Sequence, residues 1–501
     1  MSRARNSAWN LAAALGFTLV SAAANFFATP WLLRWLGSER LGAFKALTDW
    51  IGHLTFVEFG LGGALMAAFV ARISQGDRAG VTRMAAAGIR AYWSVALLQI
   101  AGGILLVVAL PHLISLSHLT PSELRAAGAV ALAPVIVTPL LVFRALAESR
   151  QRGYMNSLLL AAQVLVMTAL ALIAARLGWG LIGQGLALAV AQILTLLALA
   201  LDGTRAYRGV WSAAQEAIDR NALRRLSWPT FVHGLTDRIG LVSDNLVVAW
   251  ILGPAAVVPF FLTQQLVALT QFQVRSIGQA TWAGFAELHA QGNHAKLRTR
   301  LLELTGVVSG LGVAALAPVA AYNRAFVHLW VGRDGYAGDA VTALACVNAV
   351  LWGVFALWGW AILGTGHIGW WMPFAILSTL LNIVVSVFGT FTFGLVGPLL
   401  GTTAGFVLVT SWALPRVLHR AFAISPRMLW QAVLSPLRWG LAFAVVLRAV
   451  AAYHPPVGWL EFIGLAGPTA AGGLVLWWRL SLRREERSVW RARLRRVAPW
   501  R

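Results

Sequence analysis

Long apolar stretches separated by short polar turns run along the whole chain. Fourteen of them are long enough to cross a bilayer, which takes about 20 mainly apolar residues in a helix. They lie roughly at 9–33, 42–71, 84–110, 122–147, 155–176, 181–202, 227–252, 256–285, 301–321, 340–364, 369–391, 394–414, 430–451 and 458–480. The pattern predicts an all-α polytopic membrane protein.

Composition agrees with this pattern and excludes several other classes. The 501 residues are 59% hydrophobic and 12% charged, whereas soluble domains average about 25% charged. We therefore exclude a soluble enzyme and a disordered chain. The first apolar segment is too long for a signal-peptide core, so we expect it to be a permanent helix. Cys346 is the single cysteine, and with no Cys/His cluster the sequence predicts neither a metal nor a cofactor.

The formal net charge of +22 could indicate nucleic-acid binding or membrane topology. With the N-terminus in the cytoplasm, most Lys and Arg fall in cytoplasmic segments, including Arg150, Arg152, Arg416 and Arg420. The basic excess therefore indicates topology and not nucleic-acid binding. An even number of spans places both termini in the cytoplasm. The basic tail 481–501 is predicted to lie on anionic lipid as a short interfacial helix, with partner docking as the alternative.

An internal repeat divides the chain. Shifted by 216 residues, 36–79 aligns with 252–295 without a gap, and 11 of the 44 positions are identical. Six spans separate the copies, which predicts parallel repeats that form a MATE-like fold of two lobes around a central cavity. The expected organisation is an N-lobe (1–203), a cytoplasmic linker (204–226), a C-lobe (227–415), two extra helices (416–480) and the tail (481–501).

The eighth segment carries the most informative polar pattern. At 100° per residue, five of its residues fall within an arc of about 80°. They are Gln264, Gln271, Arg275, Gln279 and Trp282. Such a face suits a wet cavity better than lipid, because Arg can fork onto phosphate oxygens and aromatic rings can stack on sugars. These residues are the predicted substrate-binding set.

Ionisable residues inside predicted spans are costly and usually have a function or a partner. Besides Arg275, the candidates are Lys45, Asp49, Glu58, Arg90, Asp237, Arg238 and Asp244. Lys45 and Asp49 are four residues apart and can pair, so Asp49 is either structural or ion-coupling. For Glu58 and Asp244 two roles remain open: a buried structural hydrogen bond, or coupling to H⁺ or Na⁺. Arg90 is open between the cavity and the membrane surface.

Several stretches carry a family resemblance. They are WLLRWLGSERLGAF, VEFGLGGALMAAFVA and GLVSDNLVVAWILGPAAVVPFFLTQQL. Glu58-Phe59-Gly60-Leu61 stands where the family often has Asp-Phe-Gly-Leu, and Asp244 takes an Asp position in the third stretch. The chain resembles the oligosaccharide (O-antigen/polysaccharide) flippase family of the multidrug/oligosaccharidyl-lipid/polysaccharide exporter (MOP) superfamily.

This resemblance implies transfer of undecaprenyl-pyrophosphate-linked oligosaccharide from the cytoplasmic to the periplasmic leaflet of a bacterial inner membrane, without enzymatic chemistry. Arg275, Arg238 and Arg90 are the candidate cavity cations that it implies. Glycosyltransferases and a glycan polymerase are the implied protein partners.

Other functions fit parts of the sequence. A cation-coupled multidrug exporter or a lipid II flippase of the same superfamily would share the fold. A membrane glycosyltransferase or polymerase would need a sizeable outer loop, and the largest one, 322–339, is small. A static helical scaffold would need no lobe motion.

Overall fold

The computed structural model describes residues 3–58, 60–213, 243–481 and 487–488. Every element in these residues is helical, which confirms the predicted all-α class. Eleven helical stretches are long and apolar enough to cross a membrane. Ile368–Phe422 covers two expected spans, and Ala12–Glu58 covers the first expected span and the start of the second, so helices occur at thirteen of the fourteen. The remaining one, 227–252, lies mostly outside the described residues, with a helix visible over 243–251.

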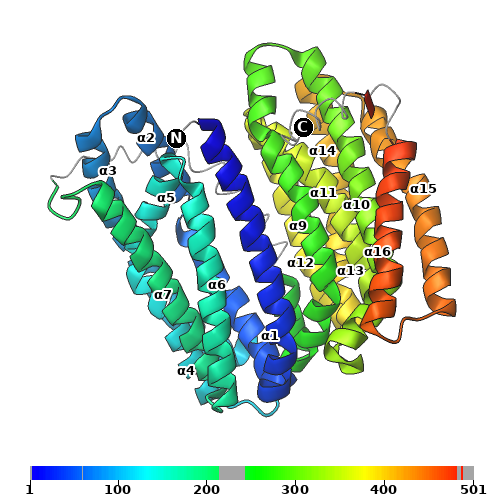
Figure 1. Cartoon of the computed structure of the whole chain (residues 1–501), viewed down its shortest axis with the longest axis horizontal. Coiled ribbons are helices and arrows are strands. Elements are labelled where there is room, and N and C mark those ends of the chain that lie inside the picture. Colours follow the sequence, from blue (N-terminus) through cyan, green and yellow to red (C-terminus); the bar gives the residue numbers. More distant parts are fainter. Residues whose placement is uncertain (1–2, 59, 214–242, 482–486, 489–501) are drawn as a thin grey trace. The chain divides into compact units, whose positions relative to one another are not determined.

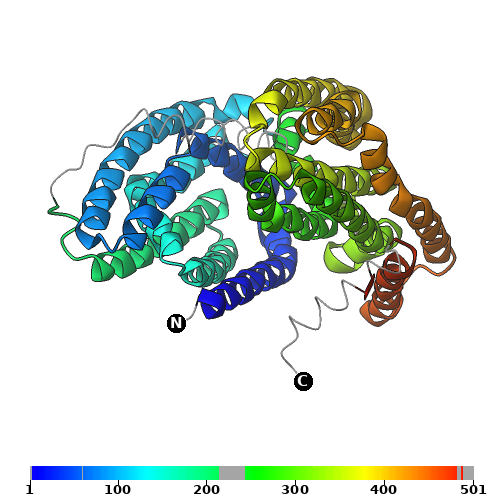
Figure 2. The same cartoon turned by 90° about the horizontal axis from the view of Figure 1, so that it is seen from above.

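The chain forms two compact units, Met1–Val258 and Pro259–Arg501. The helices of each are labelled in Figure 1 and seen from above in Figure 2. The first unit holds α1 (Arg3–Leu54), α2 (Leu61–Ser74), α3 (Arg78–Leu113), α4 (Pro121–Ala131), α5 (Leu141–Ser149), α6 (Gly153–Arg176), α7 (Gly180–Ala206) and the 243–251 helix. α9 (Pro254–Ala290) begins in the first unit and continues into the second, which further holds α10 (His294–Val331), α11 (Asp339–Gly364), α12 (Ile368–Phe393), α13 (Gly397–Gly405), α14 (Ser411–Phe422), α15 (Pro426–Tyr453) and α16 (Trp459–Leu476).

The aligned segments of the sequence repeat share backbone features. Gly37 and Gly253 both have a positive φ, of 79° and 87°, a conformation that costs glycine little. In the loops that follow the repeated helices, Asp77 accepts from the N–H of Gly80, and Asn293 accepts from the N–H of Lys296. The same turn and the same kind of helix cap therefore recur 216 residues apart.

The second expected span differs from its repeat. We expected one helix over 42–71, but α1 ends at Leu54, a 3₁₀ turn covers Thr55–Glu58, and α2 starts after Gly60 with φ 76°. The aligned part of α9 continues as one helix, and Ser276 stands there in place of Gly60. The prediction of an unbroken helix was therefore wrong in the first copy, because glycine permits a left-handed backbone there.

The fourth expected span is also interrupted. A 3₁₀ segment that contains Pro134 and Pro139 covers Ala133–Leu140 between α4 and α5. Proline lacks the N–H that an α-helical hydrogen bond needs.

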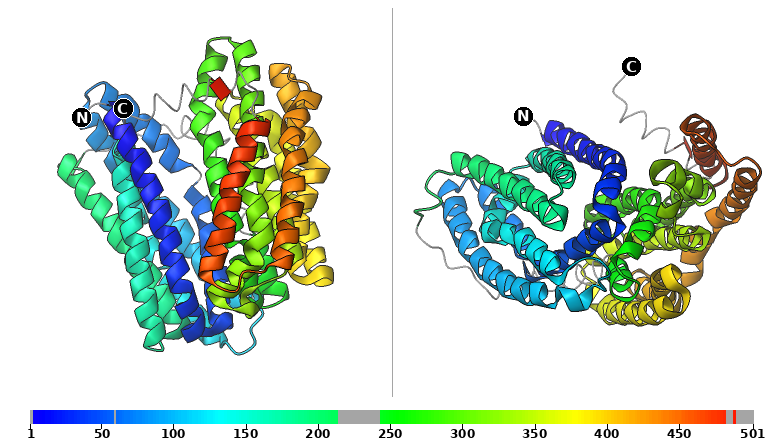
Figure 3. Two further views of the ribbon diagram at one scale, coloured as in Figure 1. Left: turned by 45° about the vertical axis from the view of Figure 1, so that its right-hand side comes forward. Right: turned by 90° about the horizontal axis from the view of Figure 1, so that it is seen from below.

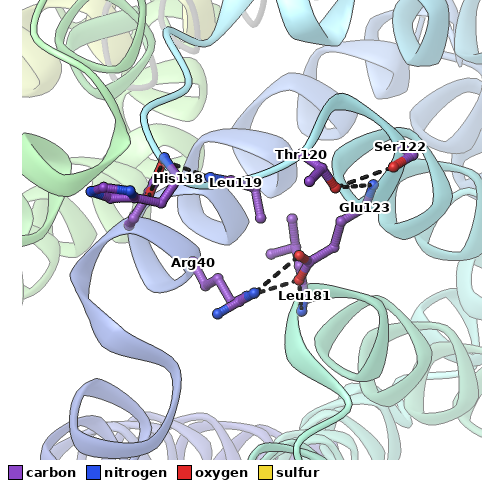
Figure 4. Close-up of polar contacts among 8 residues, drawn as sticks. Arg40, His118, Leu119, Thr120, Ser122, Glu123 and Leu181 are labelled. Atoms are coloured by element: carbon purple, nitrogen blue, oxygen red, sulfur yellow. Dashed lines mark hydrogen bonds and ion pairs between the residues drawn. The ribbon is translucent and has the colours of Figure 1, made fainter.

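A polar cluster ties three connections of the first unit together (Figure 4). Glu39, just after the Gly37 bend, accepts from the backbone N–H groups of 117–119, between α3 and α4. Arg40 forms a two-point pair with Glu123 at 2.9 and 3.2 Å. The same carboxylate accepts from the N–H of Leu181 at the start of α7. These bonds fix the Gly37 bend of α1 and the starts of α4 and α7 against one another.

Several helices of the second unit pack closely in pairs. A Cβ at Gly401 would lie 2.0 Å from Ser386 Oγ, and one at Gly397 would lie 2.1 Å from the N of Thr390, so α13 packs directly against the backbone of α12. α15 and α16 pack on α10 (Figure 3). Between α10 and α15, the Ser309 hydroxyl donates to the carbonyl of Val433 at 2.9 Å. The two extra helices therefore belong to the second unit.

Candidate functional site

The polar stripe of the eighth span lies on one continuous helix. α9 runs from Pro254 to Ala290 without interruption, so Gln264, Gln271, Arg275 and Gln279 share a face as predicted. Gln279 and Trp282 are exposed, whereas the other three are half-buried. Gln264 lies ten residues, or about 15 Å, from the start of the helix, and the stripe continues from there toward its far end.

Two tryptophans of α11 meet this stripe inside the second unit. The Arg275 guanidinium carbon lies 6.0 Å from the centre of the Trp352 ring, at the limit for a cation–π contact. The Trp282 ring lies 6.2 Å from that of Trp360. The sequence analysis did not single out either α11 residue, although their spacing of eight residues places them near one face of a helix.

Glycines allow α9 and α11 to approach closely at this place. A Cβ at Gly364 of α11 would lie 2.6 Å from Trp282 Cδ1, and one at Gly278 of α9 would lie 3.0 Å from Trp360 Cδ1. The indole rings thus occupy the space that a side chain larger than that of glycine would need at these two positions. The result is a surface that combines amides, a guanidinium and aromatic faces.

Asp49 has two side-chain partners in the first unit. Lys45 donates to Oδ1 at 2.7 Å, as the four-residue spacing predicted. Asn245, on the 243–251 helix, donates to Oδ2 at 2.8 Å. Asp49 is only 9% exposed, so these two donors supply the hydrogen bonds that the carboxylate would receive from water at the surface.

Glu58 lies at the break between α1 and α2. Its Oε1 accepts from the Tyr92 hydroxyl at 2.5 Å and from the N–H of Gly62 at 3.0 Å. A carboxylate is favourable here, because the first N–H groups of a helix carry partial positive charge. Asp49 and Glu58 have different partners, so the described contacts do not join the two carboxylates into one site.

The remaining predicted site residues do not converge in the described part of the chain. Arg238 lies outside the described residues, as does Asp237. Asp244 has a buried Oδ1 without a hydrogen-bond partner among the described residues. Arg90 is exposed on α3, twelve residues from its start.

Comparison with protein families identifies the chain. The family model described as polysaccharide biosynthesis protein matches residues 6–283, more than half of the 501 residues. The chain belongs to the polysaccharide biosynthesis protein family. This match confirms the resemblance to a polysaccharide family that the sequence motifs indicated. No curated protein matches the sequence closely enough to add to this.

Solved structures with the same fold are transporters. An inward closed structure of the lipid II flippase MurJ matches with a TM-score of 0.69 and 11% identity, over 93% of this chain and 99% of MurJ. An inward-facing multidrug resistance MATE transporter of the MOP superfamily gives 0.64 and 16%, over 82% and 98%. The eukaryotic MATE transporter AtDTX14 gives 0.56 and 14%, over 87% and 99%. The chain is therefore a multi-pass membrane protein with the transporter fold of this superfamily.

Proposed function

We propose that this protein is a flippase that moves a lipid-linked oligosaccharide, carried on undecaprenyl pyrophosphate, from the cytoplasmic to the periplasmic leaflet of a bacterial inner membrane. Membership of the polysaccharide biosynthesis protein family supports a glycan as the transported head group. The observation that carries the proposal is the Arg275, Trp352, Trp282 and Trp360 surface between α9 and α11. Its groups suit sugar rings, hydroxyls and a diphosphate.

The physical need for such a surface follows from desolvation. Each sugar hydroxyl costs about 4–8 kcal/mol to move from water into hydrocarbon without a hydrogen-bond partner. The amides of Gln264, Gln271 and Gln279 can replace water at the hydroxyls. Arg275 can fork onto phosphate oxygens, and the indoles can stack on ring faces. The lipid tail stays in the bilayer while the head group crosses.

The position of the stripe suits capture from the cytoplasmic side. With both termini in the cytoplasm, the α9–α10 turn is cytoplasmic and the start of α9 is periplasmic. The 37 residues of α9 extend about 55 Å, and the stripe begins some 15 Å from its periplasmic end. Three of its five residues, Arg275, Gln279 and Trp282, therefore lie in the cytoplasmic half of the helix. Alternating access would then carry the head group outward as one lobe rocks against the other.

Three carboxylates are the proposed coupling groups for H⁺ or Na⁺. Asp49 is buried and Glu58 is half-buried, and both accept side-chain hydrogen bonds. Asp244 Oδ1 has no hydrogen-bond partner among the described residues. Cation entry at any of them would change local charge and hydrogen bonding. The protein is not proposed to make or break covalent bonds; glycosyltransferases and a glycan polymerase would supply and consume its substrate.

Substitution Arg275→Ala tests the proposal. Loss of a charge-assisted contact to phosphate should reduce glycan transfer about tenfold or more at unchanged protein level. The matched control is Arg298→Ala, because Arg298 is exposed on α10 and forms no ion pair with another described residue. Surface glycan is measured in cells that depend on this protein, together with head-group accessibility in proteoliposomes. Normal glycan in the Arg275 variant, or an equal loss in the control, refutes the assignment.

Lipid II transfer is the second candidate, because the similarity to MurJ covers 93% of this chain. Lipid II also presents a sugar-linked diphosphate on a polyprenyl tail, so the same surface could bind it. Rescue of cells depleted of their own lipid II flippase would favour this candidate. Dye efflux by cells that make only this protein would instead favour multidrug export, as in the MATE transporters.

A further inference from the structure

Three connections of the second unit meet at one end of its helices. The His289 ring lies 5.4 Å from the rings of His294 and His367, and His367 lies 5.6 Å from Phe422. These residues mark the α9–α10 turn, the α11–α12 turn and the end of α14. The exposed basic residues Lys296, Arg298 and Arg427 lie in the turns or first helical turns at the same end, so the positive-inside rule makes this end cytoplasmic.

Two arginines at this end are held on tryptophan rings. The Arg416 guanidinium carbon lies 4.9 Å from the centre of the Trp412 ring, and that of Arg420 lies 4.5 Å from the Trp370 ring. Arg416 and Arg420 are one helical turn apart on α14, and both are exposed. Stacking engages the flat face of a guanidinium and leaves its N–H groups, which lie in the plane, free to bind an anion.

Nothing acidic in the described residues neutralises this pair. Neither arginine has an ion pair there, and residues 340–460, which comprise almost all of α11 through α15, contain no Asp or Glu. An exposed pair of guanidiniums without counter-charge attracts a phosphate or other anion from its surroundings. At the membrane surface the abundant anion is a lipid head group.

An exposed apolar surface adjoins the pair. Trp412 contacts Phe374 of α12, with ring centres 5.5 Å apart. Further along α12, Ile376, Leu377 and Leu380 are 45–56% exposed, and Val407 and Leu408, just before α14, are 51% and 59% exposed. The apolar side chains extend from the tryptophans away from the basic end. Their length and chemistry match acyl chains below a head group.

We propose that Arg416 and Arg420, on the shelf formed by Trp370 and Trp412, bind the head-group phosphate of an anionic phospholipid of the cytoplasmic leaflet. The acyl chains lie along α12 and residues 407–408. The site contains no residue of the α9 stripe, so it does not depend on which substrate the protein carries. Bound lipid would stabilise the α12–α14 packing of the second unit.

The test compares phosphatidylglycerol with phosphatidylcholine on the purified full-length protein. Native mass spectrometry counts bound lipids, and thermal unfolding in detergent reports their effect. Phosphatidylglycerol should bind the wild type and raise its Tm, whereas phosphatidylcholine should do neither. The double variant Arg416→Gln/Arg420→Gln should lose about tenfold in phosphatidylglycerol affinity while keeping its Tm in phosphatidylcholine.

A matched double variant distinguishes a specific lipid site from nonspecific electrostatic attraction of anionic lipid. Arg298→Gln/Arg427→Gln removes the same charge from the same end without touching a tryptophan, and should bind phosphatidylglycerol as the wild type does. An equal loss in this control means that only net charge matters and overturns the proposal. Undiminished binding by the Arg416/Arg420 variant also overturns it.

A lysine double variant and a measurement with inorganic phosphate complete the test. If the glutamine variant is unstable, Arg416→Lys/Arg420→Lys retains both charges without the planar stack, and should bind about fivefold more weakly than the wild type. Wild-type affinity in that variant contradicts the stacked geometry. Inorganic phosphate should not raise the Tm of the wild type; a shift equal to that from phosphatidylglycerol would mean a free-anion site and no lipid site.

Discussion

The Tyr92 hydroxyl donates to Glu58 Oε1 at 2.5 Å, and this bond joins α3 to the break between α1 and α2. The same oxygen accepts from the N–H of Gly62, so one carboxylate holds the start of α2 and the neighbouring helix together. A coupling role for Glu58 requires its negative charge, whereas a structural role requires only its hydrogen-bond acceptor. Substitutions that keep the acceptor but change the charge can therefore separate them.

Glu58→Gln should leave the protein folded with a Tm close to that of the wild type. The amide oxygen can still accept from Tyr92 and Gly62, whereas the negative charge is gone. If Glu58 couples transport to a cation, flipping in proteoliposomes should fall and lose its dependence on the H⁺ or Na⁺ gradient. Unchanged gradient dependence would remove Glu58 from the coupling groups. Tyr92→Phe is the structural control, and should lower stability by about 1–3 kcal/mol.

Asp49 and Lys45 should show strong coupling in a double-mutant cycle. Asp49→Leu leaves the Lys45 ammonium and the Asn245 amide without their acceptor, and breaking a buried pair in this way costs about 3–5 kcal/mol. Lys45→Met/Asp49→Leu removes both charges and should be more stable than Asp49→Leu alone. Thermal or denaturant unfolding of the purified proteins measures the difference. Additive losses would show that the pair contributes little.

Glu123→Ala should destabilise the first unit more than Arg40→Ala. Removal of Glu123 leaves both the Arg40 guanidinium and the N–H of Leu181 without an acceptor, whereas removal of Arg40 breaks only the ion pair. Arg125→Ala is the matched control, because Arg125 is exposed on the same helix. Unfolding temperatures of the three variants test the order. A larger effect for Arg40 would contradict it.

Gly364→Ala should impair transport by displacing Trp282. The added methyl would lie 2.6 Å from Trp282 Cδ1 and 3.0 Å from its carbonyl oxygen, so the indole has to move away from Trp360. Gly369→Ala is the control, because a Cβ there meets no atom within 4 Å. Head-group transfer in proteoliposomes should fall only for the Gly364 variant. Equal activity of the two would show that the Trp282 position does not matter.

Acid should destabilise the histidine cluster at the α9–α10 and α11–α12 turns of the second unit. Burial lowers the pKa of His367, and the neighbouring His289 and His294 lower it further. The folded protein then binds fewer protons than the unfolded chain near and below the ordinary histidine pKa of about 6.5, so the free energy of unfolding falls as pH drops through that value. The Tm should decrease from pH 7.5 to 5.5, and less so in His367→Gln. His118→Gln, at an exposed histidine, should decrease as the wild type does.

The sequence by itself determined the all-α class and the approximate positions of most spans in the described residues. Hydropathy suffices for these, because every backbone polar group in a bilayer must be satisfied within a helix, so an apolar run of sufficient length has one favourable structure. Local spacing also predicted the Lys45–Asp49 pair and the shared face of Gln264, Arg275 and Gln279. These features depend only on residues within one helix.

Tertiary structure decided the partners that come from elsewhere in the chain. Glu58 meets Tyr92 34 residues away, Asp49 meets Asn245 196 residues away, and Arg275 and Trp282 meet tryptophans of α11. Helical periodicity gives the direction of a side chain but not the neighbour that it faces. The break at Glu58 likewise needed the structure, because a glycine permits a left-handed turn without requiring one.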